Sequence, residues 1–371
     1  MTARSADQLA AAFEAERPYL RRLAYGTLGS LAEADDVVQE AWLRLQRADA
    51  DSVRDLRAWL TTVVGRLALD ALDSARARRE RYVGPWLPEP IVEAAGSDAA
   101  LGPVASGAAT RALGEDPADR ATLAEQVTTA LLVVLERLSP AERTAFVLHD
   151  VFGLPFQEVA EVVGRTPAAV RQLASRARRR VEDGTPRFPA SREEHAGVVA
   201  AFAEAWTSGD VERLLRVLDP EVTFRSDGGG KVSAALRPQH GADHVARMLV
   251  SFSRVNHRLG GRAQTAQVDV NGLPGLVVDD GQVTSVISLT VDGGRITAID
   301  VVRNPDKLRH VVTAAGGPAA GPGRAGRGPA GEGSAEQAQG DPAPGRPATG
   351  EPGTAEPTAA DPDETAADRR D

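Results

Sequence analysis

The chain has 371 residues, enough for two or three domains, with a formal net charge of −9 and no cysteine. The absence of cysteine excludes disulfides, thiolate chemistry and cysteine-ligated zinc. The start of the sequence lacks the apolar core of a signal peptide and no apolar run approaches a membrane span, so we expect a cytoplasmic protein with no membrane partner. The negative net charge argues against a protein that binds nucleic acid over its whole surface. A local basic patch is nevertheless enough to bind a DNA groove.

Three helices are predicted in the N-terminal part of the chain. Residues 6–29 place apolar side chains at near-helical spacing, with Pro18 as a kink or a break. A second helix, at 32–47, buries apolar residues on one face. Its other face displays Asp35, Asp36, Gln39, Glu40 and Arg44. A polar loop at 47–54 then leads to a long helix at 55–81 that ends in arginines, and we expect the three helices to form one small all-α domain.

A stiff, extended segment follows these helices. Three prolines between Gly84 and Pro90 exclude a regular helix and favour an extended backbone. Trp86 and Leu87 are displayed on this segment and indicate a surface against which they dock, although a proline-rich spacer is the alternative interpretation. The Ala-, Gly- and Asp-rich residues 93–120 are typical of a mobile linker.

A helix-turn-helix is predicted at residues 154–181. Its first helix has one apolar face, Gly164 suits the left-handed residue that ends it, and Thr166 with Pro167 suits the start of the next helix. From Gly164 to Arg180 the sequence has six arginines and no acidic residue. Such a helix fits a DNA major groove, where arginine reads guanine or grips phosphate and glutamine reads adenine. An ordinary helical hairpin with a solvated basic face is the alternative.

Residues 191–310 predict helices and a meander of strands. Helices are expected at 191–207, 211–218 and 242–253. Strands are expected at 222–225, 263–270, 275–278, 283–291 and 296–302. Asp292, Gly293 and Gly294 give a hairpin-turn signal. Helices followed by a sheet that curls around them make an α+β cone.

The end of the chain has the composition of a disordered segment. From Gly316 to Asp371 the sequence contains no Leu, Ile, Val, Met or aromatic residue. Such a chain cannot bury enough apolar surface to offset the entropy lost on ordering. We therefore expect an acidic, disordered Gly/Pro/Ala-rich tail at 313–371.

Two segments of the chain resemble bacterial sigma factors. Residues 31–82 resemble region two of such a factor, and residues 123–182 resemble region four. The acidic helix at 35–40 carries the first resemblance, together with Ala58, Trp59, Leu60, Arg66 and Asp70. The short linker, with no promoter-contacting domain inserted, resembles the extracytoplasmic-function (ECF) class. The resemblance implies an alternative sigma subunit that directs promoter recognition and transcription initiation, without catalytic activity, cofactor or metal of its own.

The resemblance also implies three binding surfaces. One is expected to bind the clamp helices of the largest subunit of core RNA polymerase: Asp35, Asp36, Gln39, Glu40 and Arg44. Another is expected to hold the −10 promoter element: Arg54, Trp59, Arg66, Asp70, Arg76, Arg78 and Arg79. The third is expected at the −35 element: Arg165, Thr166, Arg171, Gln172, Ser175, Arg176, Arg178 and Arg179. In this last set Arg171 and Gln172 are the expected base readers, and Arg176, Arg178 and Arg179 the expected phosphate contacts.

Three short motifs resemble the ECF subgroup that carries a C-terminal SnoaL-like domain. The first motif is Trp86, Leu87, Pro88, Glu89 and Pro90. The second is Asp227, Gly228, Gly229, Gly230 and Lys231, which lacks the spacing of a phosphate-binding Walker loop. The third is Asn304, Pro305, Asp306, Lys307 and Leu308. The resemblance implies a regulatory contact of the first motif with the other two.

The expected architecture is therefore multidomain. A region-two helical bundle at 1–83 and a region-four helix-turn-helix at 122–184 are joined by the linker at 84–121. A SnoaL-like α+β cone at 190–312 and the disordered tail at 313–371 follow. We expect the cone to modulate sigma activity in cis, and the sequence leaves open whether the cone also holds a small-molecule ligand.

Two other functions compete with that of a sigma factor. SnoaL-like cones include small-molecule isomerases and cyclases with an acid or base in the pocket, for which Asp227, His240, Asp243 and His244 are the candidates. No acid and base are paired by spacing here, which disfavours an enzyme fused to a DNA-binding module. A ligand-sensing helix-turn-helix activator is the other alternative, and it would not need residues 31–82.

Overall fold

The computed structural model describes residues 6–48, 53–79, 82–94, 127–186, 188–258 and 263–311. The chain divides into two units, Met1–Arg324 and Ala325–Asp371, and every described residue belongs to the first. Most of the predicted mobile linker, from residue 95 onwards, lies outside the described residues. The predicted disordered tail at 313–371 also lies outside them.

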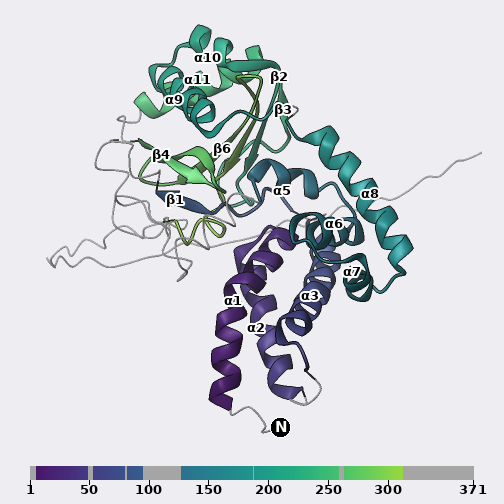
Figure 1. The fold of residues 1–371 in the computed structure, drawn as a ribbon. Helices are drawn as coiled ribbons and strands as arrows, with labels where there is room; N and C mark the ends of the chain where they lie inside the picture. Colours follow the sequence, from purple (N-terminus) through teal and green to yellow (C-terminus); the bar gives the residue numbers. More distant parts are fainter. Residues whose placement is uncertain are drawn as a thin grey trace, which may run out of the picture. The chain divides into compact units, whose positions relative to one another are not determined.

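Three helices form the N-terminal bundle: α1 (Ala6–Leu28), α2 (Leu31–Arg47) and α3 (Leu56–Arg79) (Figure 1). Each contributes buried apolar side chains to one cluster, among them Leu23, Val38 and Val64. A break at Pro18 was a wrong prediction, because α1 continues through that residue. Phe13 and Leu20, on either side of the proline, are both buried in the bundle. Tertiary packing of this kind stabilises a helix more than its intrinsic propensity does.

The predicted helix-turn-helix is present in the second helical segment. Short elements precede it: α5 (Thr129–Leu135), α6 (Pro140–Phe146) and the π-helical turn η2 (Val147–Val151). The motif itself consists of α7 (Phe156–Val163) and α8 (Pro167–Gly184). Gly164 ends α7 with φ +67°, and the Thr166 hydroxyl accepts a hydrogen bond from the backbone N of Ala169 at 3.2 Å. The predicted end of one helix and start of the next are confirmed.

The two helical segments share one hydrophobic core. Leu148 of η2 and Val162 of α7 belong to the same buried cluster as Leu60 and Val64 of α3. Gly65 is the point of closest approach, since a Cβ at this position would lie 2.9 Å from a side-chain carbon of Val162. A residue without a side chain permits this contact. Helix α3 therefore packs directly against the first helix of the helix-turn-helix.

An α+β domain follows, as predicted. Its helices are α9 (Arg192–Ser208), α10 (Val211–Val217) and α11 (Ala242–Arg258). Its strands are β2 (Leu218–Asp227), β3 (Gln239–His240), β4 (Gln264–Val270), β5 (Leu273–Asp279), β6 (Thr284–Asp292) and β7 (Arg295–Val302). The helices cover one face of the sheet (Figure 1) and bury a cluster that includes Phe202, Val222 and Leu289. We call this domain the cone.

The sheet has seven strands in the order β1-β4-β5-β6-β7-β2-β3. All neighbours are antiparallel except β2 and β7, which pair in parallel. The strand β1 (Val92–Ala94) comes from the expected linker, and Val92 pairs with Val270 of β4. The linker therefore completes one edge of the sheet.

Both faces of the sheet are buried. On β5, Leu276 and Val278 belong to the cluster under the helices, whereas Val277 between them belongs to a separate cluster. Successive side chains of a strand point to opposite faces, so the second cluster lies on the face away from the helices. That second cluster also contains Leu87 of the linker and Leu308.

In the described part of the chain no helix is long and apolar enough to cross a membrane.

Candidate functional site

The expected polymerase-binding face of α2 is accessible. Its opposite face is buried, with Val38 and Ala41 in the bundle core. The side chains of Asp35, Asp36, Gln39 and Arg44 are exposed and that of Glu40 is half-buried. Arg21 of α1 donates two hydrogen bonds to the Asp35 carboxylate, at 2.6 and 2.9 Å, and Arg44 pairs with Glu40 at 3.1 Å. The buried face fixes the helix, and the charged face remains available to a protein partner.

The expected DNA-reading helix, α8, is also accessible. Arg165, Thr166, Arg171, Gln172, Arg176 and Arg179 are exposed, and Ser175 and Arg178 are half-buried. The guanidinium of Arg171 lies 5.4 Å from the centroid of the Phe156 ring, which holds the side chain over the start of α7. Arg178 is already paired with Asp150 at 2.5 Å. The Phe156 ring thus orients Arg171 without neutralising its positive charge. Arg178, in contrast, must break its ion pair with Asp150 before it can bind a phosphate.

The expected −10 surface on α3 is partly engaged by the second helical segment. Both Nε and Nη2 of Arg66 donate to the backbone O of Glu161 in α7, at 3.3 and 3.0 Å. Trp59 is half-buried against the bundle core, and Arg54 and Asp70 are exposed. The side chains of Arg76, Arg78 and Arg79 lie outside the described residues. Through Arg66 and Gly65, one side of α3 is occupied by the helix-turn-helix.

The carboxylate of Asp227, at the end of β2, is the centre of the contact between linker and cone. It is fully buried. Its Oδ1 accepts hydrogen bonds from the Tyr82 hydroxyl at 2.6 Å and from the backbone N of Gly229 at 3.0 Å. Its Oδ2 accepts from the backbone N of Leu87 at 2.9 Å and from Nζ of Lys307 at 2.8 Å. A buried carboxylate needs a paired charge and hydrogen-bonded oxygens, and these four donors meet both needs.

Lys307 joins the third motif to the first. Its Nζ lies 3.9 Å from the centroid of the Trp86 ring and 5.3 Å from that of Tyr82, and aromatic faces attract a cation. The same ammonium group donates to the backbone O of Leu87. Nearby, Nδ2 of Asn304 donates to the Tyr82 hydroxyl at 2.8 Å. Burial raises the pKa of Tyr82, so its hydroxyl keeps the proton that it donates.

Gly229 of the second motif packs against Asn304 of the third motif. Gly229 has φ +60°, and a Cβ there would lie 2.3 Å from the side-chain nitrogen of Asn304. Only glycine satisfies both the backbone conformation and the close approach. Lys231 forms an ion pair with Asp306, and this hydrogen bond lowers the pKa of Asp306. The buried residues of the three motifs are Leu87, Pro88, Glu89, Pro90, Asp227, Gly228, Asn304, Pro305 and Leu308.

Glu89 of the first motif caps the helix that carries the expected polymerase-binding face. Its Oε2 accepts from the backbone N of Leu31 at 2.8 Å and from the Ser30 hydroxyl at 3.2 Å. A carboxylate at the N-terminus of a helix satisfies free N–H groups and complements the helix dipole. His310 lies 3.5 Å from Glu89 and donates to the backbone O of Pro90 at 2.7 Å, and burial lowers the pKa of His310. The linker is therefore bound to α2 as well as to the cone.

The candidates for acid–base catalysis have separate partners in the structure. Asp227 is engaged by linker and cone as described. Nδ1 of His240 lies 3.1 Å from the Thr223 hydroxyl, and Nε2 of His244 lies 3.0 Å from Oε1 of Gln239. No contact between described residues joins Asp227 to either histidine.

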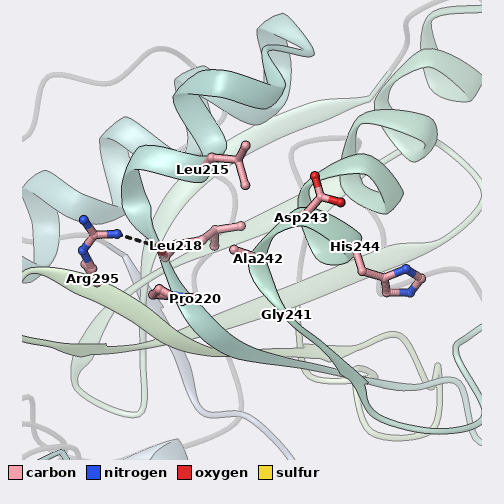
Figure 2. A pocket seen from close by; sticks show the side chains of 8 residues that line it. All are labelled: Leu215, Leu218, Pro220, Gly241, Ala242, Asp243, His244 and Arg295. Carbon is pink, nitrogen blue, oxygen red and sulfur yellow. Dashed lines mark hydrogen bonds between the residues drawn. The ribbon is translucent and has the colours of Figure 1, made fainter.

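Asp243 and His244 do share one open pocket on the cone, of 580 Å³. Figure 2 shows the imidazole of His244 directed away from the Asp243 carboxylate. Asp243 pairs with Arg247 at 2.8 Å, and Arg295 across the pocket donates to the backbone O of Leu218 at 3.1 Å. Asp243, His244 and Arg295 around this pocket thus each have a partner of their own. No cluster of three or more His, Cys, Asp or Glu that could hold a metal ion occurs in the ranges that the structure describes.

Some residues of these contacts were missed by sequence reasoning. Tyr82 lies two residues before Gly84, where the stiff segment begins, but nothing in its local pattern pairs it with Asp227. Asn271 and Gly272 form a hairpin-turn dipeptide between two predicted strands, and this signal locates the turn without revealing that it is buried. The cap supplied by Glu89 likewise comes from a segment distant in sequence from α2.

Known proteins resemble this chain along most of its length. Residues 12–78 match the family model of Sigma-70 region 2, and residues 128–181 match that of Sigma-70, region 4. The ECF RNA polymerase sigma factor SigJ of Mycobacterium tuberculosis is 42% identical over 303 residues, which cover 80% of this chain and 91% of SigJ. The probable ECF RNA polymerase sigma factor SigI of the same species is 37% identical over 312 residues, 84% of this chain and 98% of SigI. The crystal structure of M. tuberculosis SigJ has a TM-score of 0.63 at 38% identity and covers 81% of this chain and 99% of that one.

Proposed function

Because this chain belongs to the ECF family of RNA polymerase sigma factors, we propose that it binds core RNA polymerase and directs initiation at specific promoters. The observation that carries this proposal is the pairing of two exposed faces on one chain. The acidic face of α2 lies within the match to region two, and the arginine-bearing helix α8 lies within the match to region four. A helix-turn-helix regulator that binds DNA by itself would need only the second of these faces.

The proposal assigns a role to each face. The α2 face (Asp35, Asp36, Gln39, Glu40 and Arg44) binds the clamp helices of the polymerase largest subunit. On α8, Arg171 and Gln172 read bases of the −35 element, and Arg176, Arg178 and Arg179 contact phosphates, with Arg165, Thr166 and Ser175 beside them. On α3, Arg66 and Asp70 with Trp59 and Arg54 hold the melted −10 strand, helped by Arg76, Arg78 and Arg79.

We further propose that the cone regulates this activity in cis. The contacts around Asp227 tie the linker to the cone, and Glu89 ties the same linker to α2. Meanwhile Arg66 and Gly65 tie α3 to α7. These contacts hold the two DNA-binding surfaces in one arrangement, while the α2 and α8 faces stay exposed. Promoter engagement then requires a population shift to an open form in which α3 and α7 separate.

We also propose that the cone has no catalytic activity. The engagement of Asp227 by linker and cone, and the separate partners of His240, Asp243 and His244, support this view. A ligand of the cone would act only by favouring the closed or the open form.

Run-off transcription tests the main proposal. Purified core polymerase is incubated with genomic promoter fragments, with and without the full-length chain. We expect initiation at defined start sites only when the chain is present. If the chain binds those fragments alone but gives no initiation with core polymerase, the helix-turn-helix activator replaces the sigma factor.

A further inference from the structure

The tip of the β4–β5 hairpin is buried, which is unusual for a turn. Val270 pairs with Leu273, and the two residues between them are Asn271 and Gly272. Both have positive φ angles, +49° and +77°, as a two-residue hairpin turn requires. Such turns usually lie in water. Yet Asn271 is only 1% exposed.

The side-chain amide of Asn271 is bound by residues that all lie outside the cone. Its Nδ2 donates to the Tyr25 hydroxyl of α1 at 2.7 Å and to the backbone O of Val127 at 3.4 Å. Its Oδ1 accepts from the backbone N of Ile91 at 3.2 Å and from the Thr129 hydroxyl of α5 at 3.3 Å. The backbone N of Asn271 also donates to the backbone O of Ile91, at 2.8 Å.

These four partners use the full capacity of the amide. A carboxamide has two N–H donors and one oxygen with two lone pairs, and here each is occupied. Aspartate would lack both donors, and serine has one donor on a shorter side chain. An amide is therefore the group that this buried position needs, because any donor or acceptor left unpaired there costs free energy.

The partners come from three parts of the chain. Tyr25 belongs to region two, Ile91 to the linker, and Val127 and Thr129 stand at the start of region four. The Tyr25 hydroxyl is itself fully used, since it also donates to the backbone O of Glu89 at 2.8 Å. If region four moved away, the amide would lose Val127 and Thr129, two of its four partners, while it remained bound to Tyr25 and Ile91. If region two moved away, the amide would lose Tyr25.

We propose that Asn271 is a clasp. Its side-chain amide binds region two and region four at the same time and couples the release of one region to the release of the other. This inference deepens the proposed regulation in cis and rests on it. The clasp is distinct from the contacts around Asp227, which binds Tyr82 and Leu87, and Lys307 of the third motif, and no residue of region four. Because the partners of Asn271 belong to two regions, opening at this residue is cooperative. Either both regions stay bound to the hairpin tip or both are released from it.

Amide hydrogen exchange in the full-length chain tests the clasp. Asn271→Gly keeps the positive φ of the turn and removes only the amide. Exchange of the segment 84–90 reports opening through the backbone N of Leu87 and Glu89, which bind Asp227 and Gly29 and not Asn271. We expect exchange there to accelerate at least about tenfold, since several buried hydrogen bonds are lost. Exchange in α9 should be unchanged.

A matched control uses the other end of the same strand. Asp280→Gly alters the β5–β6 turn, where Oδ1 accepts from the backbone N of Gln282 and Val283, without touching a sigma region. It should leave exchange at 84–90 unchanged. Unchanged exchange at 84–90 in Asn271→Gly, with α9 still protected, would overturn the clasp.

A double-mutant cycle addresses the coupling and covers the case in which Asn271→Gly disturbs the cone. Tyr25→Phe and Thr129→Val each remove one hydroxyl that binds the amide, one from each sigma region. We expect their effects on exchange at 84–90 to be non-additive in the natural chain and additive in the Asn271→Gly background. Additive effects in both backgrounds would show that the two regions are released independently and would contradict the clasp.

Transcription separates this inference from the function on which it rests. If Asn271→Gly speeds exchange at 84–90 and changes run-off transcription, both the clasp and the regulation in cis are supported. If it speeds exchange but transcription is unchanged, the clasp stands and the regulation in cis fails.

Discussion

The hydroxyl of Tyr82 lies 2.6 Å from Oδ1 of Asp227, across 145 positions of the sequence. Tyr82 follows α3, the helix expected to hold the −10 element, and Asp227 ends the strand β2 of the cone. The same carboxylate binds the backbone of Leu87 and the ammonium of Lys307. A single buried charge therefore links the end of the region-two bundle, the linker and the C-terminal motif, and disturbing any of its partners is expected to loosen all three.

Replacement of Trp86 by alanine removes the aromatic face that covers the Lys307 ammonium. We expect the closed form to lose about 2 kcal/mol, from lost apolar contact and the lost cation–π interaction. Small-angle scattering should show a larger radius of gyration, and run-off transcription should change. Phe188→Ala is the control, because Phe188 is 73% exposed. Unchanged scattering and transcription for Trp86→Ala would reduce the segment to a spacer.

Reversal of charge on α2 tests the polymerase-binding face. Asp36→Arg combined with Glu40→Arg should weaken co-purification with core polymerase about 100-fold or more, because the substitutions reverse the charge of the face proposed to make the contact. Circular dichroism should show unchanged helicity, since the opposite face of α2 holds the fold. Glu193→Arg with Glu212→Arg makes the same change of charge on helices of the cone and should bind normally. A folded α2 variant with normal binding would refute the assignment.

Substitutions on α8 separate base reading from phosphate contact. Arg171→Ala should cost about 1–3 kcal/mol and relax the preference at one −35 position. Arg179→Ala should weaken binding to all sequences alike and reduce the salt dependence. Competition binding with a panel of single-base promoter variants, at two salt concentrations, measures both effects. Equal losses on every sequence for both variants would contradict the division of roles.

Acid should destabilise the cone through His195. This side chain is 3% exposed and its Nε2 has no hydrogen-bond partner. Burial lowers the pKa of His195 below its ordinary value of 6.5. The unfolded chain then binds the proton more readily, so stability is present above pH 6.5 and is lost as the pH falls through the lower pKa of the folded state. Thermal unfolding of the full chain at several pH values measures this loss. His195→Met should flatten the dependence, with the remaining slope due to other groups such as His310.

Local patterns predicted the helical elements well. The apolar face of α2, the glycine after α7 and the threonine and proline before α8 act within one or two turns of helix, so their consequences can be read from neighbouring residues. The strand positions β4 to β7 also followed from alternation. The break expected at Pro18 was wrong because the packing of Phe13 and Leu20 outweighed a local signal.

Long-range pairings could not be predicted in this way. The parallel pairing of β2 with β7 joins segments that a meander would leave apart, and nothing in Val92 to Ala94 distinguishes an edge strand from a linker. Tyr82 and Asn271 acquire their partners only when distant segments meet. Family resemblance brought the three motifs together, but the four-partner amide of Asn271 belongs to no motif and emerged only from the structure.

The strand β1 changes what separation of the sigma regions from the cone would entail. When Val92 to Ala94 leave β4, a row of unpaired backbone N–H and C=O groups on β4 faces water, and such an edge readily pairs with another chain. An open form in which β1 leaves β4 would therefore expose a strand edge that the closed form covers. A fragment that begins at residue 190 would carry this bare edge permanently, so β1 of the linker protects the cone against pairing with another chain.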